Sequence, residues 1–180
     1  MAEKIPPPKS PKEILALPEN KVFLSRMEKY NDKIKEHKFL DEDSINEELS
    51  QLNLSLNASL DVNKDNLLAY SSVMNKIISY KERIAYLCNR GFADHKVVSG
   101  AYNNLYKQWI GVFSNQKSQD RREGEANYLL SSLHDMMITR EVIYENLRRI
   151  AFNLSSEADM ISRKITLIQL NANLSKDNDE

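Results

Sequence analysis

The stretch that decides the fold is NLLAYSSVMNKIISYKERIAYLC, residues 66–88. Its apolar residues recur at helical spacing, at Leu67, Tyr70, Met74, Ile77, Ile84 and Cys88. Residues spaced this way share one face of an α-helix. The pattern resumes after Gly91 at Val97, Val98, Tyr102, Leu105, Trp109 and Phe113. The spacing predicts a long helical region over residues 63–113, which Gly91 either ends or only weakens.

A second periodic region follows the polar residues Ser114–Gln119, which we expect to form a turn. It runs from about Asp120 to Leu170, with a possible break near Ser131–Ser132. Its C-terminal part carries a near-heptad apolar stripe, here called the C-terminal seam: Ile143, Leu147, Ile150, Leu154, Ala158, Ile161, Ile165 and Ile168. Such a seam is typical of a helical bundle or coiled coil. We expect it to bury against the long helix, against neighbouring subunits, or both. The residues predicted to mediate oligomerisation are Ile143, Leu147, Ile150, Leu154, Ile161, Ile165 and Ile168.

The N-terminal third is less regular. Residues 1–18 hold all five prolines and are expected to be a non-helical arm. A short helix over about Glu19–Lys38 and an acidic helix from Asp41 to Leu49 should follow. Over residues 52–60 leucine or alanine alternates with asparagine or serine. That alternation fits an extended strand, or a loop whose leucines fill gaps between helices.

These patterns together predict an all-α protein, a long-helix bundle or coiled-coil-like subunit that oligomerises. One short extended segment near 52–60 is possible. The expected organisation is a basic, proline-rich leader with a short helix over 1–40, a helical domain over 41–171 and a polar tail over 172–180.

Composition indicates a binding protein rather than an enzyme. The 180 residues include one cysteine and three histidines, which are far apart, and no glycine-rich phosphate loop. We therefore expect no catalytic site, metal or cofactor. His37, His95 and His134 fit surface or hydrogen-bonded positions, and Cys88 fits a core position. No segment resembles a secretion signal or a membrane span, so a soluble, intracellular protein is expected.

The charge is sorted into blocks, although the formal net charge is only −1. Residues 41–63 contain six acids and no Lys or Arg, whereas residues 64–122 contain ten bases and four acids. Three of these bases, Lys76, Arg83 and Arg90, are spaced seven apart and form a stripe beside the apolar face; we call them the basic stripe. Such a stripe is commonly a solvated helix face. It also fits a phosphate-contacting surface, because the same segment carries aromatic residues suited to base stacking.

Three segments carry a resemblance to a known family. They are DSINEELSQLNLSLNASLDVNKDNLLAYSSVMNKIISYKERIAYL (43–87), GEANYLLSSLHD (124–135) and FNLSSEADMISRKITLIQ (152–169). The first is similar to the N-terminal half of the UvsY-type recombination mediators of tailed phages, including its Tyr70-Ser71, Asn75-Lys76 and Lys81-Glu82 pairs. The other two resemble the family's C-terminal part, with Leu130-Ser131 and Ser162-Arg163 at nearly the family spacing. Residues 1–40, Gly91 and 114–123 depart from the family pattern.

The resemblance implies a non-catalytic helical homo-oligomer that binds single-stranded DNA. Such a protein helps to load a RecA-like recombinase onto strands covered by single-strand-binding protein, in phage recombination, replication and repair. Its location would then be the cytoplasm of the bacterial host. The family's contact region matches Lys96, and by position we add Lys76, Lys81, Arg83 and Arg90. The alternative is a helical scaffold or virion assembly protein whose basic face binds acidic protein surfaces.

Overall fold

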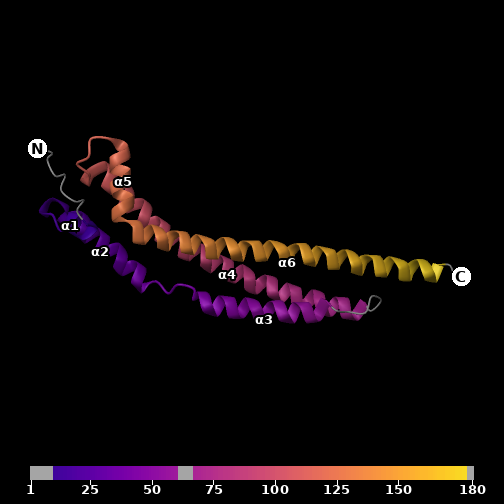
Figure 1. Cartoon of the computed structure of the whole chain (residues 1–180). Helices are drawn as coiled ribbons and strands as arrows, with labels where there is room; N and C mark the ends of the chain where they lie inside the picture. Colours follow the sequence, from indigo (N-terminus) through magenta and orange to yellow (C-terminus); the bar gives the residue numbers. More distant parts are fainter. Residues whose placement is uncertain (1–9, 61–66, 178–180) are drawn as a thin grey trace, which may run out of the picture. The chain divides into compact units, whose positions relative to one another are not determined.

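The computed structural model describes residues 10–60 and 67–177, and every regular element in them is a helix. In chain order these are α1 (Pro11–Leu15), a 3₁₀ turn (Pro18–Asn20), α2 (Lys21–Glu36), α3 (Glu42–Leu60), α4 (Leu67–Gln108), a π-helical turn (Trp109–Phe113), α5 (Gln119–Leu129) and α6 (Ser131–Asp177) (Figure 1). The prediction of an all-α fold with long helices is confirmed: α4 has 42 residues and α6 has 47.

The chain divides into two compact units, each assembled from two separate stretches of sequence. Unit 1 comprises Met1–Phe39 and Asp94–Arg140, and unit 2 comprises Leu40–Ala93 and Glu141–Glu180. Helices α4 and α6 therefore each contribute to both units. This division differs from the expected single helical domain over 41–171.

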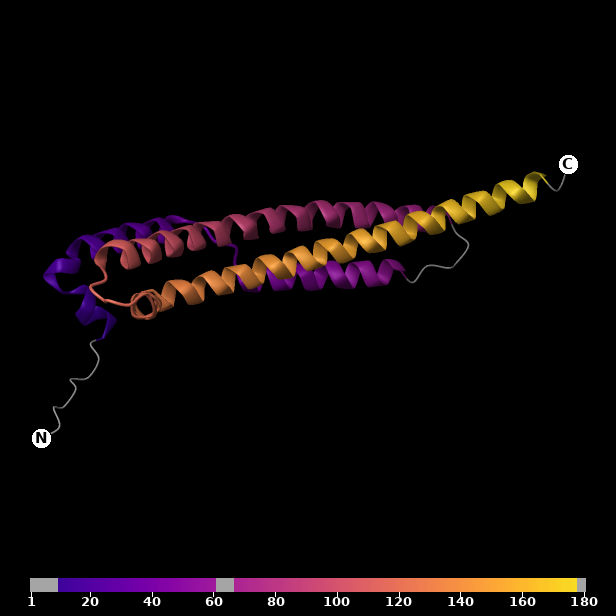
Figure 2. The same cartoon turned by 90° about the horizontal axis from the view of Figure 1, so that it is seen from above.

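Unit 2 is a three-helix bundle with an aliphatic core. Helix α3, helix α4 as far as Ala93 and helix α6 from Glu141 onward run alongside one another in both views (Figures 1 and 2). Their buried residues are Ile45, Val73, Ile77, Ile84, Leu87, Ile143, Leu147, Leu154, Ala158 and Ile161. In both views the C-terminal end of α6 extends beyond the other two helices.

Unit 1 has an aromatic core built from α2, the end of α4 and α5. Phe23 is fully buried, and its ring meets the Trp109 ring edge-on with centroids 4.8 Å apart. The Phe113 ring lies 5.2 Å from Phe23. The α-helical ladder of α4 changes to the wider π pattern here, and Ser114 N–H donates to the Trp109 carbonyl at 2.8 Å. This wider turn positions Trp109 and Phe113 to pack on the same ring of α2.

The prediction of an extended segment or loop near 52–60 is wrong, because α3 continues as a helix to Leu60. Every second residue in that stretch is apolar, but Ile45, Leu49 and Leu52 also follow steps of four and three, as a helix requires. Ile45 is buried, and Leu49 and Leu52 pack on the same core. Asp41 has already started the helix by accepting from Ser44 N–H at 3.1 Å, and adding residues to an existing helix is easier than starting one.

The prediction of a non-helical leader is also wrong for its described part, because Pro11–Leu15 form α1. Ser10 accepts from Glu13 N–H, and Glu13 accepts in return from Ser10 N–H at 2.6 Å. This reciprocal cap stabilises a helix start, and proline is tolerated at the first helical position. The remainder of the leader, residues 1–9, lies outside the described residues.

The predicted turn and the predicted break near Ser131–Ser132 agree with the structure, whereas the predicted end of the last helix near Leu170 does not. Helix α4 runs unbroken through Gly91, where the backbones come close: a Cβ there would lie 3.2 Å from Leu147 Cδ1 and 3.5 Å from Tyr144 Cα. Residues 114–118 form the turn, and α5 and α6 are separated at Leu130, beside the predicted break. Helix α6 continues into the predicted polar tail as far as Asp177.

Candidate nucleic-acid interface

All five predicted DNA-contacting residues lie on α4. Lys76, Arg83 and Lys96 are exposed, whereas Lys81 and Arg90 are half-buried. Lys96 belongs to unit 1, and the other four belong to unit 2. The five are thus ordered along one helix, with their charged ends accessible to different degrees.

The helix brings three of these five residues together. Seven residues advance an α-helix by nearly two full turns, so successive members of the basic stripe are rotated by only about 20°. Lys76, Arg83 and Arg90 therefore share one flank of α4. Lys81 and Lys96 lie on other sides, about 140° and 160° around the helix from Lys76 at 100° per residue. A single strand that follows the basic stripe would not meet all five.

Arg83 is held by the acidic helix that the sequence pattern did not connect with it. Its Nη2 donates to Glu48 Oε2 at 2.8 Å, and its Nε donates to Oε1 of the same carboxylate. This bidentate hydrogen bond lowers the pKa of Glu48 and raises that of Arg83. The Arg83 side chain is still 46% exposed and that of Glu48 30% exposed, so solvent screens the pair.

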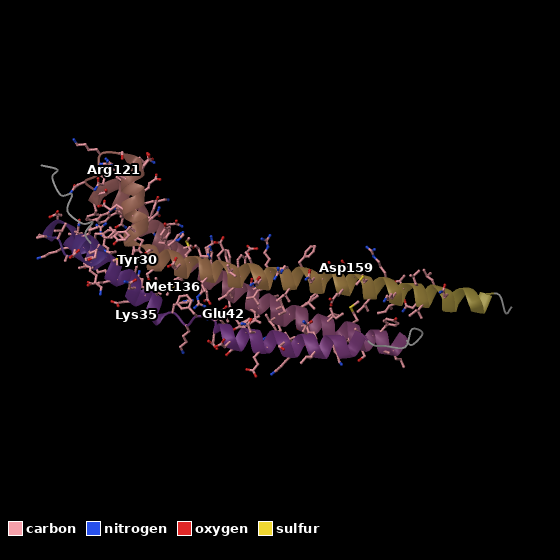
Figure 3. The ribbon with its side chains drawn as sticks, viewed as in Figure 1. Tyr30, Lys35, Glu42, Arg121, Met136 and Asp159 are labelled. Atoms are coloured by element: carbon pink, nitrogen blue, oxygen red, sulfur yellow. The ribbon has the colours of Figure 1, made fainter. Side chains whose placement is uncertain are left out.

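The ion pair between Arg83 and Glu48 shows that part of the acidic stretch, residues 41–63, lies beside α4. Helix α3 begins with Glu42 and Asp43, and Figure 3 marks Glu42 at this acidic start. Because α3 packs beside α4, a block of acids and a block of bases that are separate in sequence are neighbours within unit 2. The opposite charges of the two stretches could have predicted this contact from the sequence.

Tyr86 is one of several aromatic residues of the basic segment that the sequence suggested for base stacking, and it is the one that lies over Arg83. The residue is 53% exposed, and the Arg83 guanidinium carbon lies 5.1 Å from the centroid of its ring. Tyr102 and Trp109, which the spacing assigns to the core, are buried as expected. Phe92 is partly exposed, with its ring 5.4 Å from that of Tyr144. Tyr86 thus offers an accessible aromatic face next to the basic stripe.

The C-terminal seam lies mainly in the core of its own chain. Ile143, Leu147, Leu154, Ala158 and Ile161 are buried in unit 2, and Ile150 and Ile165 pack against the same core. Ile168 is half-buried. The bundle of α3, α4 and α6 therefore accounts for the burial of most of the seam, and these residues do not require a second subunit.

Two of the three histidines, His37 and His134, and the cysteine lie in structural surroundings, whereas Nδ1 of His95 is buried without a hydrogen-bond partner in the described part of the chain. His37 Nε2 lies 2.7 Å from Oδ1 of the buried Asp94, and the His134 ring lies 5.2 Å from Tyr102. Burial raises the pKa of the half-buried Cys88 thiol. Among the described residues, no three His, Cys, Asp or Glu side chains are grouped so that they could hold a metal ion. Within the same residues, no helix is both long enough and apolar enough for a membrane crossing.

Comparison of the chain with protein families, curated proteins and solved structures finds no match.

Proposed function

We propose that this protein is a non-catalytic mediator that binds single-stranded DNA and helps to load a RecA-like recombinase onto strands covered by single-strand-binding protein. Its setting would be phage recombination, replication and repair in the bacterial cytoplasm, and several copies would act together. The observation that carries the proposal is the exposed Tyr86 ring beside Arg83 on the flank of α4 that holds the basic stripe.

The chemistry of this flank suits an unpaired strand better than a duplex. Proteins that bind single strands combine cations that follow the phosphates with aromatic rings on which bases stack. A base inside a duplex is already stacked on both faces, so it cannot use an exposed ring without unstacking. Recognition through phosphates and stacking carries little sequence preference.

Because Arg83 is already paired with Glu48, a bound strand would have to displace this carboxylate. Strand phosphate would replace the Glu48 carboxylate on Arg83, because both are anions that accept from the guanidinium fork. The strand must therefore compete with a partner already in place. Replacing Glu48 by glutamine should raise affinity for single strands, whereas a strand that does not contact Arg83 would be unaffected by this substitution.

The direct test measures strand binding by fluorescence anisotropy over a range of salt concentrations. Lys76→Ala with Arg83→Ala should lower affinity and flatten the log–log salt dependence by about 0.7 per lost phosphate contact. Tyr86→Ala should lower affinity by about 1–3 kcal/mol while the salt slope is unchanged, because stacking releases no counterions. The different slopes separate the two kinds of contact.

The matched control is Lys12→Ala with Lys21→Ala, which removes the same charge from exposed positions of unit 1. Equal loss in the control would place the site elsewhere. Preference for duplex, or ATP turnover by the pure protein, would contradict the proposal. Loading is tested by recombinase assembly on strands pre-covered with single-strand-binding protein.

One observation favours the second candidate, a scaffold or virion assembly protein that binds acidic protein surfaces. The basic stripe already holds a protein carboxylate, since Arg83 is paired with Glu48. An acidic helix from another protein could bind in the same way. Poly-glutamate that binds with higher affinity than an oligonucleotide of equal charge would support this candidate over the first.

A further inference from the structure

One acid of α6 lies on the side of that helix that faces the core of unit 2. Alternating steps of four and three residues lead from Ile150 to Leu154, then to Glu157 and on to Ile161. At 100° per residue, Glu157 lies about 60° around the helix from Leu154 and about 40° from Ile161. Glu157 is half-buried, and its Oε2 atom is buried without a hydrogen-bond partner among the described residues.

A carboxylate oxygen in this position is costly to the fold. A carboxylate that loses its hydration is strongly destabilised unless a cation or several hydrogen-bond donors take the place of the water. Polar residues at core positions of helical bundles commonly pair across the bundle and so fix its register. Glu157 Oε2 makes no such pairing within the described ranges, so register does not explain it. A ligand that supplies the missing donor would.

Glu157 lines a cavity of about 210 Å³ inside unit 2. The aliphatic side chains in the cavity wall come from α3, α4 and α6: Leu49, Leu52, Ile84, Ile150 and Leu154. Asn53 and Asn153 also line the cavity, and both are exposed, so the cavity opens to solvent beside them. The site thus combines an apolar wall, a solvent entrance and one acid.

The size of the cavity limits the ligand to a small molecule. A cavity of about 150 Å³ with aliphatic and aromatic walls is large enough to hold benzene. The cavity beside Glu157 therefore has room for a ring of that size with a short polar arm. Small-molecule sites in proteins are commonly built in this way, with mostly apolar walls and a few polar groups that fix the orientation of the ligand.

The polar groups of the lining indicate the charge of the ligand. Glu157, Tyr80 and Asn153 each bring an oxygen atom that can accept a hydrogen bond. A primary ammonium group carries a positive charge and three N–H donors, so it can satisfy all three. An anion would be repelled by the carboxylate, and a hydrocarbon would leave it without a donor. The lining therefore fits a primary amine with a compact apolar body.

We infer that the cavity between α3, α4 and α6 binds a small primary amine. Its ammonium group pairs with Glu157, and its apolar body packs against the aliphatic wall. The site is separate from the basic stripe, and the inference does not rest on the proposed function. Charge-assisted hydrogen bonds are stronger than neutral ones, so the ammonium group should set the affinity.

Benzylamine is the probe, because one carbon joins its aromatic ring to a primary ammonium group. Titration of the full chain, followed by NMR chemical shifts, should show saturable binding with a dissociation constant of about 1 mM, as suits a ligand of this size. Benzyl alcohol has nearly the same shape without the charge and should bind about tenfold more weakly. Benzoate, which carries the opposite charge, should not bind.

Three variants assign the binding to the cavity. Glu157→Gln removes the charge at nearly constant size, so it should weaken benzylamine binding about tenfold and leave benzyl alcohol binding almost unchanged. Asp159→Asn is the matched control, because it removes one negative charge from an exposed position on the same helix (Figure 3). It should change neither affinity. Ile150→Phe should weaken the binding of both ligands, because the larger side chain fills part of the cavity.

A fourth variant separates ligand binding from a structural role of the carboxylate. Glu157→Leu should raise the melting temperature, because it removes a charge from the core side of α6, and it should abolish benzylamine binding. Circular dichroism checks the helicity of every variant. The inference is overturned if benzylamine shows no saturable binding up to about 10 mM or binds Glu157→Gln as tightly as wild type. A lower melting temperature of Glu157→Leu would overturn it too, because the carboxylate would then have a partner within the chain.

Discussion

The two units bury different kinds of residue. The buried core residues described for unit 2 are all aliphatic, whereas the core of unit 1 is organised around Phe23, Tyr102 and Trp109. The buried polar residues Asn20, Asp94 and Ser99 all belong to unit 1. Trp109 Nε1 donates to Glu125 at 3.1 Å, and Tyr102 donates to Asn127 at 2.9 Å. Unit 1 depends on specific partners, and unit 2 on a repeated pattern that many aliphatic residues would satisfy.

The largest effect that would sharpen this comparison comes from removing one core side chain in each unit. Phe23→Ala should cost about 3–5 kcal/mol and Leu147→Ala about 2–5 kcal/mol, since both side chains are almost fully buried. The protein contains a single tryptophan, Trp109, whose ring lies 4.8 Å from that of Phe23. Phe23→Ala should therefore also shift the native fluorescence to longer wavelength.

Leu147→Ala is the matched control, because Leu147 belongs to the unit without a tryptophan. Chemical denaturation followed by fluorescence and by circular dichroism measures both effects. If the native fluorescence shifted equally in the two variants, a change in either core would affect Trp109. This result would contradict the view that the two cores are separate.

This contrast explains how much of the fold could be predicted from the sequence. The heptad spacing of the C-terminal seam and of α4 correctly indicated long helices, because residues that pack into an aliphatic core recur at helical spacing in the sequence. The spacing does not show whether an apolar stripe packs against its own chain or against another subunit. Ile143 and Leu147 therefore fitted a subunit interface as well as the bundle core in which they lie. The alternation over 52–60 led to the wrong prediction of an extended segment, although Ile45, Leu49 and Leu52 in the same region already follow helical spacing.

The candidate site was predictable only along one helix. The seven-residue spacing of Lys76, Arg83 and Arg90 gives their shared flank once α4 is helical. The contact between Arg83 and Glu48 joins residues 35 apart in sequence, and such a contact has no local signature. The exposure of Tyr86 likewise depends on which face of α4 the other helices leave open, and its own position in the sequence does not reveal this.

A smaller effect tests how closely the helices of unit 2 approach one another. At Gly91 an added side chain would meet the tightly packed Leu147, whereas at Gly100, in unit 1, nothing lies within 4 Å. Gly91→Val should destabilise the protein by about 1–3 kcal/mol through overpacking. Gly100→Ala should stabilise it by up to about 1 kcal/mol, because alanine favours the helix. Urea denaturation gives both free energies of unfolding. If Gly91→Val left the free energy of unfolding unchanged, α4 and α6 could separate at this point without cost.

The smallest expected effect concerns the exposed ion pair of unit 2, in contrast to the buried polar contacts of unit 1. The hydrogen bond from Arg83 lowers the pKa of Glu48 below its ordinary value of 4.5 in the folded chain. The ionised carboxylate therefore stabilises the fold above about pH 4.5, and this contribution is lost as the pH falls through the lowered value. Since both partners are partly exposed, we expect about 0.2–1 kcal/mol at neutral pH.

The measurement compares the free energy of unfolding of wild type and Glu48→Gln at neutral and acidic pH. Their difference should be present at neutral pH, shrink with added salt and vanish in acid, where wild-type Glu48 is also uncharged. Asp41, whose pKa is lowered by its hydrogen bonds from Ser44, is unchanged in both proteins, so its own pH dependence cancels. In an Arg83→Ala background the substitution should have almost no effect, because the partner of Glu48 is gone. A difference that persists undiminished in acid would instead assign the effect to packing of the Glu48 side chain, and the ion pair would not distinguish unit 2 from unit 1.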